Sequence, residues 1–128
     1  MTIDWGKVIT AEDKAAEALA EVKKSIAAKR YEQETRGIEV MGMQVDTGRD
    51  SQGLIAGAAL QGLINPEYTV NWKCQSGEFI SLTSQQIIGL ASTVRAHVQA
   101  CFDREGEILT ALANSEYTPE MLEEGWPE

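Results

Sequence analysis

The residues of this chain that could carry chemistry are one histidine, His97, and two cysteines, Cys74 and Cys101. A histidine can transfer protons near neutral pH, and a thiolate can act as a nucleophile or a metal ligand. Neither cysteine belongs to a CxxC pair, and His97 has no serine, cysteine or carboxylate partner at a recognisable spacing. We therefore expect all three side chains to be structural.

Other chemical signals are also missing from the sequence. It contains no phosphate-binding loop, no dinucleotide fingerprint, and no HExxH or GxSxG motif. A disulfide between Cys74 and Cys101 is geometrically possible, but a reducing compartment disfavours it. An enzyme or a small-molecule binder would need a polar pocket around His97 or Trp72, for which the sequence offers little. We expect no catalytic residue, no metal and no cofactor.

The composition is typical of one soluble globular domain: 128 residues, of which 43% are hydrophobic and 24% charged. The net charge is −9, and because an acidic protein repels phosphate backbones, nucleic-acid binding is not expected. No apolar run approaches the roughly 20 residues that span a bilayer, so no membrane contact is expected. The N-terminal residues lack the apolar core of a secretory signal, which favours a cytoplasmic location.

The C-terminal tail, residues 114–128, is acidic but also contains four large side chains with apolar surface: Tyr117, Met121, Leu122 and Trp126. A merely solvating tail would seldom include them, since they gain nothing in water. The tail either folds back on the domain or forms a recognition segment that a partner orders; plain disorder is a third, less favoured interpretation. Trp5, in the N-terminal segment 1–9, invites the same two interpretations.

An N-terminal helix is predicted over residues 10–36, because Thr10 and Asp13 have the spacing of a capping box. Its apolar stripe is narrow and consists of Ala15, Leu19, Val22 and Ile26. Such a helix either packs on a small patch of the domain or pairs with another copy of the chain. The candidate partner-binding residues are therefore Trp5, Leu19, Val22, Ile26, Tyr117, Met121, Leu122 and Trp126.

Two β-hairpins are predicted from alternating apolar residues. A two-residue turn at Met41-Gly42 would pair Val40 with Met43 and Ile38 with Val45. A three-residue loop at Gln75-Ser76-Gly77, with Gly77 in the left-handed conformation, would pair Val70 with Leu82 and Trp72 with Ile80. Both registers place the apolar side chains on one face, and we expect Trp72 in the core.

A middle helix is predicted over residues 48–64, opened by a capping box of Thr47 and Asp50 and ended by Asn65-Pro66. One side of it carries Leu54, Ile55, Ala58, Ala59 and Leu63. The helix also carries three glycines, which either permit close packing onto the sheet or form a groove for a partner chain: Gly53, Gly57 and Gly62.

The last helix is predicted over residues 84–113, with Thr83 and Gln86 as its capping box. The order is therefore α-ββ-α-ββ-α, an α+β fold in which a small antiparallel sheet from two β-hairpins has helices packed on it. The core domain would comprise residues 37–113, between the N-terminal helix and the tail.

Three segments of the chain resemble a family of unassigned biochemistry that is common in tailed bacteriophages and prophages. They are RYEQETRGIEVMGMQVDT, with the Thr47-x-Arg49-x-Ser51 start of the middle helix, then YTVNWKCQSGEFISLT, and then QIIGLASTVRAHVQACFDREGEI. The flanking DWGKVITAEDKAAEAL and the closing GWP are similar to the ends of phage tail-fibre assembly proteins. The resemblance covers roughly residues 30–112.

The resemblance implies a non-enzymatic chaperone or accessory protein that binds a phage tail-fibre chain in the host cytoplasm. An alternative is a structural tail or baseplate component that stays in the virion. A third, less favoured interpretation is an uncharacterised enzyme or small-molecule binder. The family has no established catalytic or ligand residues, so none carries over to this chain.

Overall fold

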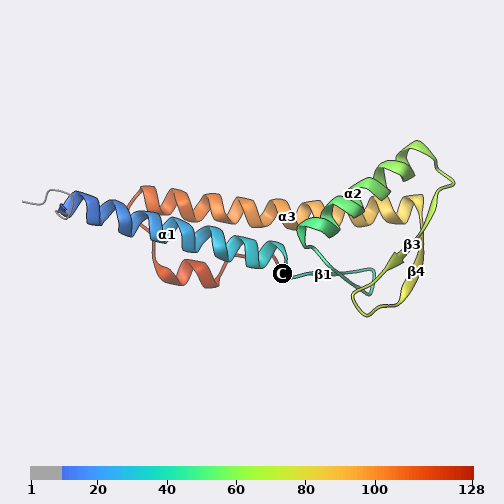
Figure 1. Ribbon diagram of the computed structural model, residues 1–128, viewed down its shortest axis with the longest axis horizontal. Helices are drawn as coiled ribbons and strands as arrows, with labels where there is room; N and C mark the ends of the chain where they lie inside the picture. The colour runs from blue at the N-terminus through green and yellow to red at the C-terminus, as the bar shows by residue number, and fades with distance from the viewer. Residues whose placement is uncertain (1–9) are drawn as a thin grey trace, which may run out of the picture.

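The computed structural model describes residues 10–128 and confirms the α+β class and the predicted order of elements (Figure 1). Within these residues three helices, α1 (Ala11–Glu34), α2 (Arg49–Ile64) and α3 (Ser84–Ala113), alternate with two hairpins. The hairpins are β1 (Ile38–Val40) with β2 (Met43–Val45), and β3 (Thr69–Lys73) with β4 (Phe79–Thr83). A short 3-10 helix, η2 (Pro119–Glu123), follows α3. None of the helices in residues 10–128 is both long and apolar enough to cross a bilayer.

Both predicted hairpin registers are confirmed, since Val40 pairs with Met43 and Trp72 with Ile80. Met41 and Gly42 both have positive φ, as a type I′ turn requires, and Gly77 has a φ of +91°. The predicted single sheet, however, is two separate two-stranded sheets. One backbone hydrogen bond joins the hairpins, from Gln75 N–H to the carbonyl oxygen of Gln44 at 3.3 Å.

The molecule has two parts, which we call the head (residues 37–98) and the stem (residues 10–36 and 99–128). The main apolar core lies in the head, where both hairpins and α2 pack against the first turns of α3; it includes Val45, Ile55, Leu82, Ile87, Leu90 and Val94. In the stem, α1 packs along the second half of α3 (Figure 1) and buries Ile26 completely, while α3 buries Ile108. Long α3 therefore joins the two parts.

The predicted capping boxes at Thr10 and Thr83 are confirmed, but the one predicted at Thr47 is wrong. Gly48 is the N-cap of α2, and no side chain caps it. Thr47 is fully buried instead, and its hydroxyl donates to the carbonyl oxygen of Glu34 at 2.7 Å and accepts from the N–H of Gly37 at 3.0 Å. Thr47 thus ties the base of the first hairpin to the end of α1.

The predicted apolar side of α2 is only partly buried. Ile55 and Ala59 are buried, but Leu54 and Leu63 are 66% and 67% exposed. Of the three glycines of α2, Gly62 alone makes a close contact, and it makes this contact with α3 rather than with a sheet. A Cβ at Gly62 would lie 3.2 Å from the carbonyl oxygen of Ser84, so a side chain there would push α2 away from α3.

A buried carboxylate, Glu34, connects the three helices. Its side chain is 0% exposed and contacts Arg30 of α1 at 2.8 Å and Arg49 of α2 at 2.5 Å. Gln52 of α2 donates a further hydrogen bond to it at 2.9 Å. Arg30 reaches α3 as well, where it lies 3.4 Å from the Glu105 carboxylate and over the Phe102 ring, 4.4 Å from its centroid.

Opposing effects set the pKa of Glu34. Burial alone would raise it, but the hydrogen bonds from Arg49, Gln52 and Arg30, together with the charge of Arg49, hold the pKa of this carboxyl below its ordinary value. Glu34 is therefore ionised at neutral pH, and its charge stabilises the folded chain.

We expect Glu34→Gln to lower the free energy of unfolding at pH 7 by about 3 kcal/mol, because removing one partner of a buried ion pair leaves the other charges uncompensated. Urea unfolding followed by circular dichroism measures this. The matched control is Glu32→Gln, which changes an exposed glutamate of the same helix. This substitution should change the free energy of unfolding by less than about 0.5 kcal/mol. Equal effects of the two substitutions would contradict the role given to Glu34.

The stability difference between the wild-type protein and Glu34→Gln should depend on pH. Since the pKa of Glu34 is lower in the folded than in the unfolded chain, its stabilising contribution is fully present above the unfolded value of about 4.3. That contribution is lost as the pH falls through the lowered folded value. The stability difference between wild type and Glu34→Gln should therefore shrink below about pH 4. A difference that stays constant from neutral to strongly acid pH would contradict this.

Candidate functional site

The C-terminal tail folds back on the stem, which is the first of the two interpretations of its sequence. Arg104 of α3 holds it by donating from Nε to the carbonyl oxygen of Glu124 at 3.0 Å and from Nη2 to that of Met121 at 3.1 Å. Trp126 closes the segment by donating from Nε1 to the carbonyl oxygen of Leu122 at 2.8 Å. The tail is thus an ordered part of the domain.

Basic residues of α1 and the loop after it complete this docking. Lys29 lies 3.5 Å from the Glu123 carboxylate, and Arg36 donates to the carbonyl oxygen of Pro127. The apolar residues of the tail are each half-buried on their own chain: Tyr117, Met121, Leu122 and Trp126. That these four residues contact a partner remains a prediction, whereas their part in the fold is seen directly.

The predicted stripe of α1 splits into a buried and an exposed part. Ile26 is fully buried, Val22 is half-buried, and Leu19 is 43% exposed. Leu19 lines a groove of about 450 Å³ between α1 and the end of α3, which we call the α1–α3 groove; its other lining residues are Lys23, Leu109, Leu112 and Ala113. Trp5, the remaining predicted residue, lies outside the described residues.

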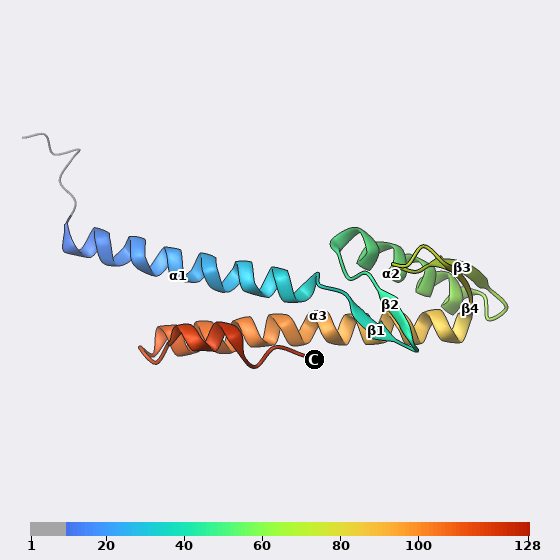
Figure 2. The ribbon, with the colours of Figure 1, turned by 90° about the horizontal axis from the view of Figure 1, so that it is seen from below.

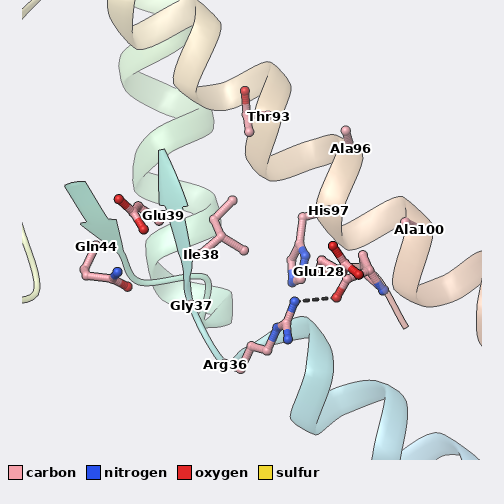
Figure 3. A pocket seen from close by; sticks show the side chains of 11 residues that line it. Arg36, Gly37, Ile38, Glu39, Gln44, Thr93, Ala96, His97, Ala100 and Glu128 are labelled. Atoms are coloured by element: carbon pink, nitrogen blue, oxygen red, sulfur yellow. Dashed lines mark hydrogen bonds between the residues drawn. The ribbon is translucent and has the colours of Figure 1, made fainter. Parts of the chain in front are cut away.

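A shallow pocket of about 580 Å³ surrounds His97 (Figure 3). Figure 3 shows Arg36 directed toward the chain end and His97 directed between α3 and the loop after α1. His97 Nε2 lies 3.0 Å from the carbonyl oxygen of Gln33. Because a carbonyl oxygen only accepts hydrogen bonds, Nε2 must carry the proton. His97 therefore fastens the end of α1 to α3.

Cys101 lies beside this histidine but is not activated by it. Its Sγ is 3.8 Å from His97 Nε2, the nitrogen that already holds a proton for Gln33. Burial raises the pKa of the Cys101 thiol, so the thiol stays protonated near neutral pH. Cys74 and Cys101 are both buried free thiols, and residues 10–128 contain no group of three or more metal-ligating side chains.

A second groove, of about 560 Å³, runs between α2 and β3 in the head and has mostly apolar walls. We call it the α2–β3 groove; its walls include Gly53, Leu54, Gly57, Val70 and Trp72. A Cβ at Gly53 or Gly57 would meet nothing within 4 Å, so these glycines leave the groove open instead of allowing close packing. Trp72 packs against the core but is only half-buried, which corrects its predicted place inside the core.

The outer edge of β3 borders this groove, because consecutive residues from Val70 to Lys73 line it. The N–H of Cys74 donates to the carbonyl oxygen of Glu78 at 2.8 Å. Cys74 and Glu78 are therefore a hydrogen-bonded pair of the antiparallel ladder. Pairs alternate along an antiparallel ladder, so Trp72 and Val70 bond to β4. The backbone groups of Asn71 and Lys73 consequently point away from β4, and no described residue forms a backbone or side-chain hydrogen bond with them.

Sequence reasoning identified the glycines of this groove but not its exposed leucine or its strand edge. Gly53 and Gly57 recur at a spacing of one helical turn, which is the signal that the sequence offered. Leu54 follows the same apolar pattern as the buried Ile55, so periodicity alone could not separate a groove wall from a core residue.

The described chain is thus a small α+β protein that presents two apolar grooves and a free strand edge. It belongs to the family described as "Domain of unknown function (DUF4376)", which matches residues 17–124. No curated protein and no solved structure shows significant similarity to it.

We expect Arg104→Ala to release the tail. Each hydrogen bond from a charged group contributes about 1.5–3 kcal/mol, so hydrogen exchange of the amides in residues 119–127 should accelerate about tenfold or more. Mass spectrometry of exchanged peptides measures the rates. The control is Arg95→Ala, which removes an exposed arginine of the same helix whose one side-chain hydrogen bond within residues 10–128 goes to Gln99 at 3.2 Å. Unchanged protection in the Arg104 variant would show that the tail is held by other contacts.

We expect both native thiols to resist labelling by a colorimetric thiol reagent at neutral pH, because Cys101 is fully buried and Cys74 nearly so. Both should react once urea unfolds the protein. Ser92→Cys, at an exposed position of α3, provides the positive control and should label at once. Rapid labelling of the native wild-type protein would contradict this account of Cys101 and His97.

Proposed function

We propose that this chain is a non-enzymatic accessory protein of bacteriophage tail-fibre assembly, a chaperone that binds a tail-fibre chain in the cytoplasm of the host bacterium. The resemblance of its sequence to tail-fibre assembly proteins supports the class of partner. The α2–β3 groove, with the free edge of β3 beside it, is the observation that supports binding of a chain segment.

The binding mode that this surface favours is addition of a strand. An edge strand with unpaired N–H and C=O groups is a template for another extended segment, and such pairing is a common mode of peptide recognition. A segment of the fibre chain that pairs with Asn71 and Lys73 would place alternate side chains over the groove. The exposed Leu54 and the half-buried Trp72 would then lose their contact with water.

The charge of the groove restricts the segment that fits it. Lys73 is the one charged residue among the described residues that line the groove. An apolar segment with neutral or acidic flanks therefore suits the groove better than a basic segment. A folding fibre chain exposes unpaired strand edges before it assembles, and covering one of them would keep the chain soluble.

Co-expression with a phage tail-fibre chain, followed by affinity capture and sizing, tests the proposal. We expect a soluble complex, and we expect the fibre chain to aggregate when this protein is omitted. A fibre chain that folds unaided, with no complex recovered, would overturn the proposal. Recovery of this protein in purified particles would instead assign it to the virion structure.

We expect Asn71→Pro to abolish capture of the fibre chain. Proline removes the outward N–H of Asn71 but none of the hydrogen bonds to β4. Ser81→Pro is the matched control, because Ser81 is the pairing partner of Asn71 and its N–H points to the opposite edge of the hairpin. Melting temperatures of the two variants check that both fold. Equal loss of capture in two folded variants would rule out pairing at the β3 edge.

A further inference from the structure

The first half of α1 has little contact with the rest of the chain. Every residue from 11 to 21 is exposed, and Figure 2 shows this half of α1 diverging from α3 toward its N-terminus. A helical segment of this length is marginally stable in water without tertiary contacts. The divergence opens the α1–α3 groove, where Leu19 faces Leu109 and Leu112 at the end of α3.

The spacing of the apolar residues in the stripe of α1 is symmetric about the middle of the stripe. Its residues Ala15, Leu19, Val22 and Ile26 follow at spacings of four, three and four. Two copies of α1 that run antiparallel about an axis between Ala20 and Glu21 would therefore place Leu19 opposite Val22 of the other copy. The small Ala15 would lie opposite the turn that carries Ile26, where α3 already fills the space.

The charges of α1 favour the same orientation. The first half carries Glu12, Asp13, Glu17 and Glu21 against Lys14, whereas Lys23 and Lys24 begin a basic second half. Glu17, Glu21, Lys23 and Lys24 form no ion pair with any described residue. An antiparallel pair brings opposite charges together, and a parallel pair would align like charges.

We propose that a second copy of this chain docks its α1 antiparallel against the α1–α3 groove, giving a two-fold symmetric dimer. An isologous contact of this kind buries Leu19, Leu109 and Leu112 of both copies at once. The contact lies in the stem, at the far end of α3 from the α2–β3 groove (Figure 1), so the dimer leaves the proposed fibre-binding surface free.

Light scattering coupled to size exclusion tests the association. We expect the mass of two chains for the wild type and of one chain for Leu19→Glu, because a carboxylate in the apolar contact costs more than the association supplies. The matched control is Leu54→Glu, which changes an exposed leucine of α2 and should leave the dimer intact. A wild-type protein with the mass of one chain at high micromolar concentration would overturn the proposal.

Oxidative cross-linking tests the orientation and does not depend on the folding of a charged variant. In the antiparallel register the two copies of residue 19 are offset by about 4.5 Å along the helix axis and those of residue 15 by about 16 Å. Leu19→Cys should therefore form an intermolecular disulfide and Ala15→Cys should not, since a disulfide needs Cα atoms within about 7 Å. Cross-linking of both variants would indicate a parallel pair, and of neither would rule out the contact.

These results are distinct from the capture experiment. Loss of dimerisation in Leu19→Glu with capture of the fibre chain intact would separate the two surfaces. Loss of capture in Asn71→Pro with the dimer intact would likewise show that the fibre-binding surface and the dimer contact are independent.

Discussion

The fold depends on one buried negative charge at the junction of its helices. Glu34 ends α1, and its carboxylate holds Arg30 of the same helix and Arg49 at the start of α2. Arg30 carries the connection to Glu105 of α3, and the backbone oxygen of Glu34 receives the hydroxyl of Thr47. Since burying an uncompensated carboxylate is costly, these groups must come together for the chain to fold.

This junction is also built from residues of the segments on which the proposed family resemblance rests. The marks of this resemblance contain Arg30, Glu34, Thr47, Arg49 and Glu105, all of which hold elements together. Of the surfaces proposed to bind partners, the β3 edge lies within one of the three segments, at Asn71 and Trp72, whereas Leu19 and Leu54 lie outside them, and the marks at the junction are structural. Marks of this kind identify a fold more directly than they identify a binding partner, because function depends on sites that a fold carries.

The hairpins and the caps of α1 and α3 could be predicted because their signals are local. Gly77 and the alternation around Trp72 fix a register within a few residues, and Thr83 with Gln86 defines a helix start. Thr47 has the same spacing to Asp50 but does not cap α2, because its hydroxyl satisfies backbone groups of Glu34 and Gly37 that the sequence does not place nearby. The burial of Glu34 and the exposure of Leu54 likewise follow from long-range packing, which periodicity does not encode.

The two-part architecture has a consequence for the order of events during synthesis. Each hairpin of the head pairs strands that are adjacent in the sequence, whereas the α1–α3 contacts Gln33–His97 and Arg30–Glu105 join residues 64 and 75 positions apart. Local contacts form sooner than contacts that close long loops. Helix α1 is therefore synthesised before the part of α3 on which it packs. Until that part is made, the apolar stripe of α1 is available to a neighbouring nascent chain.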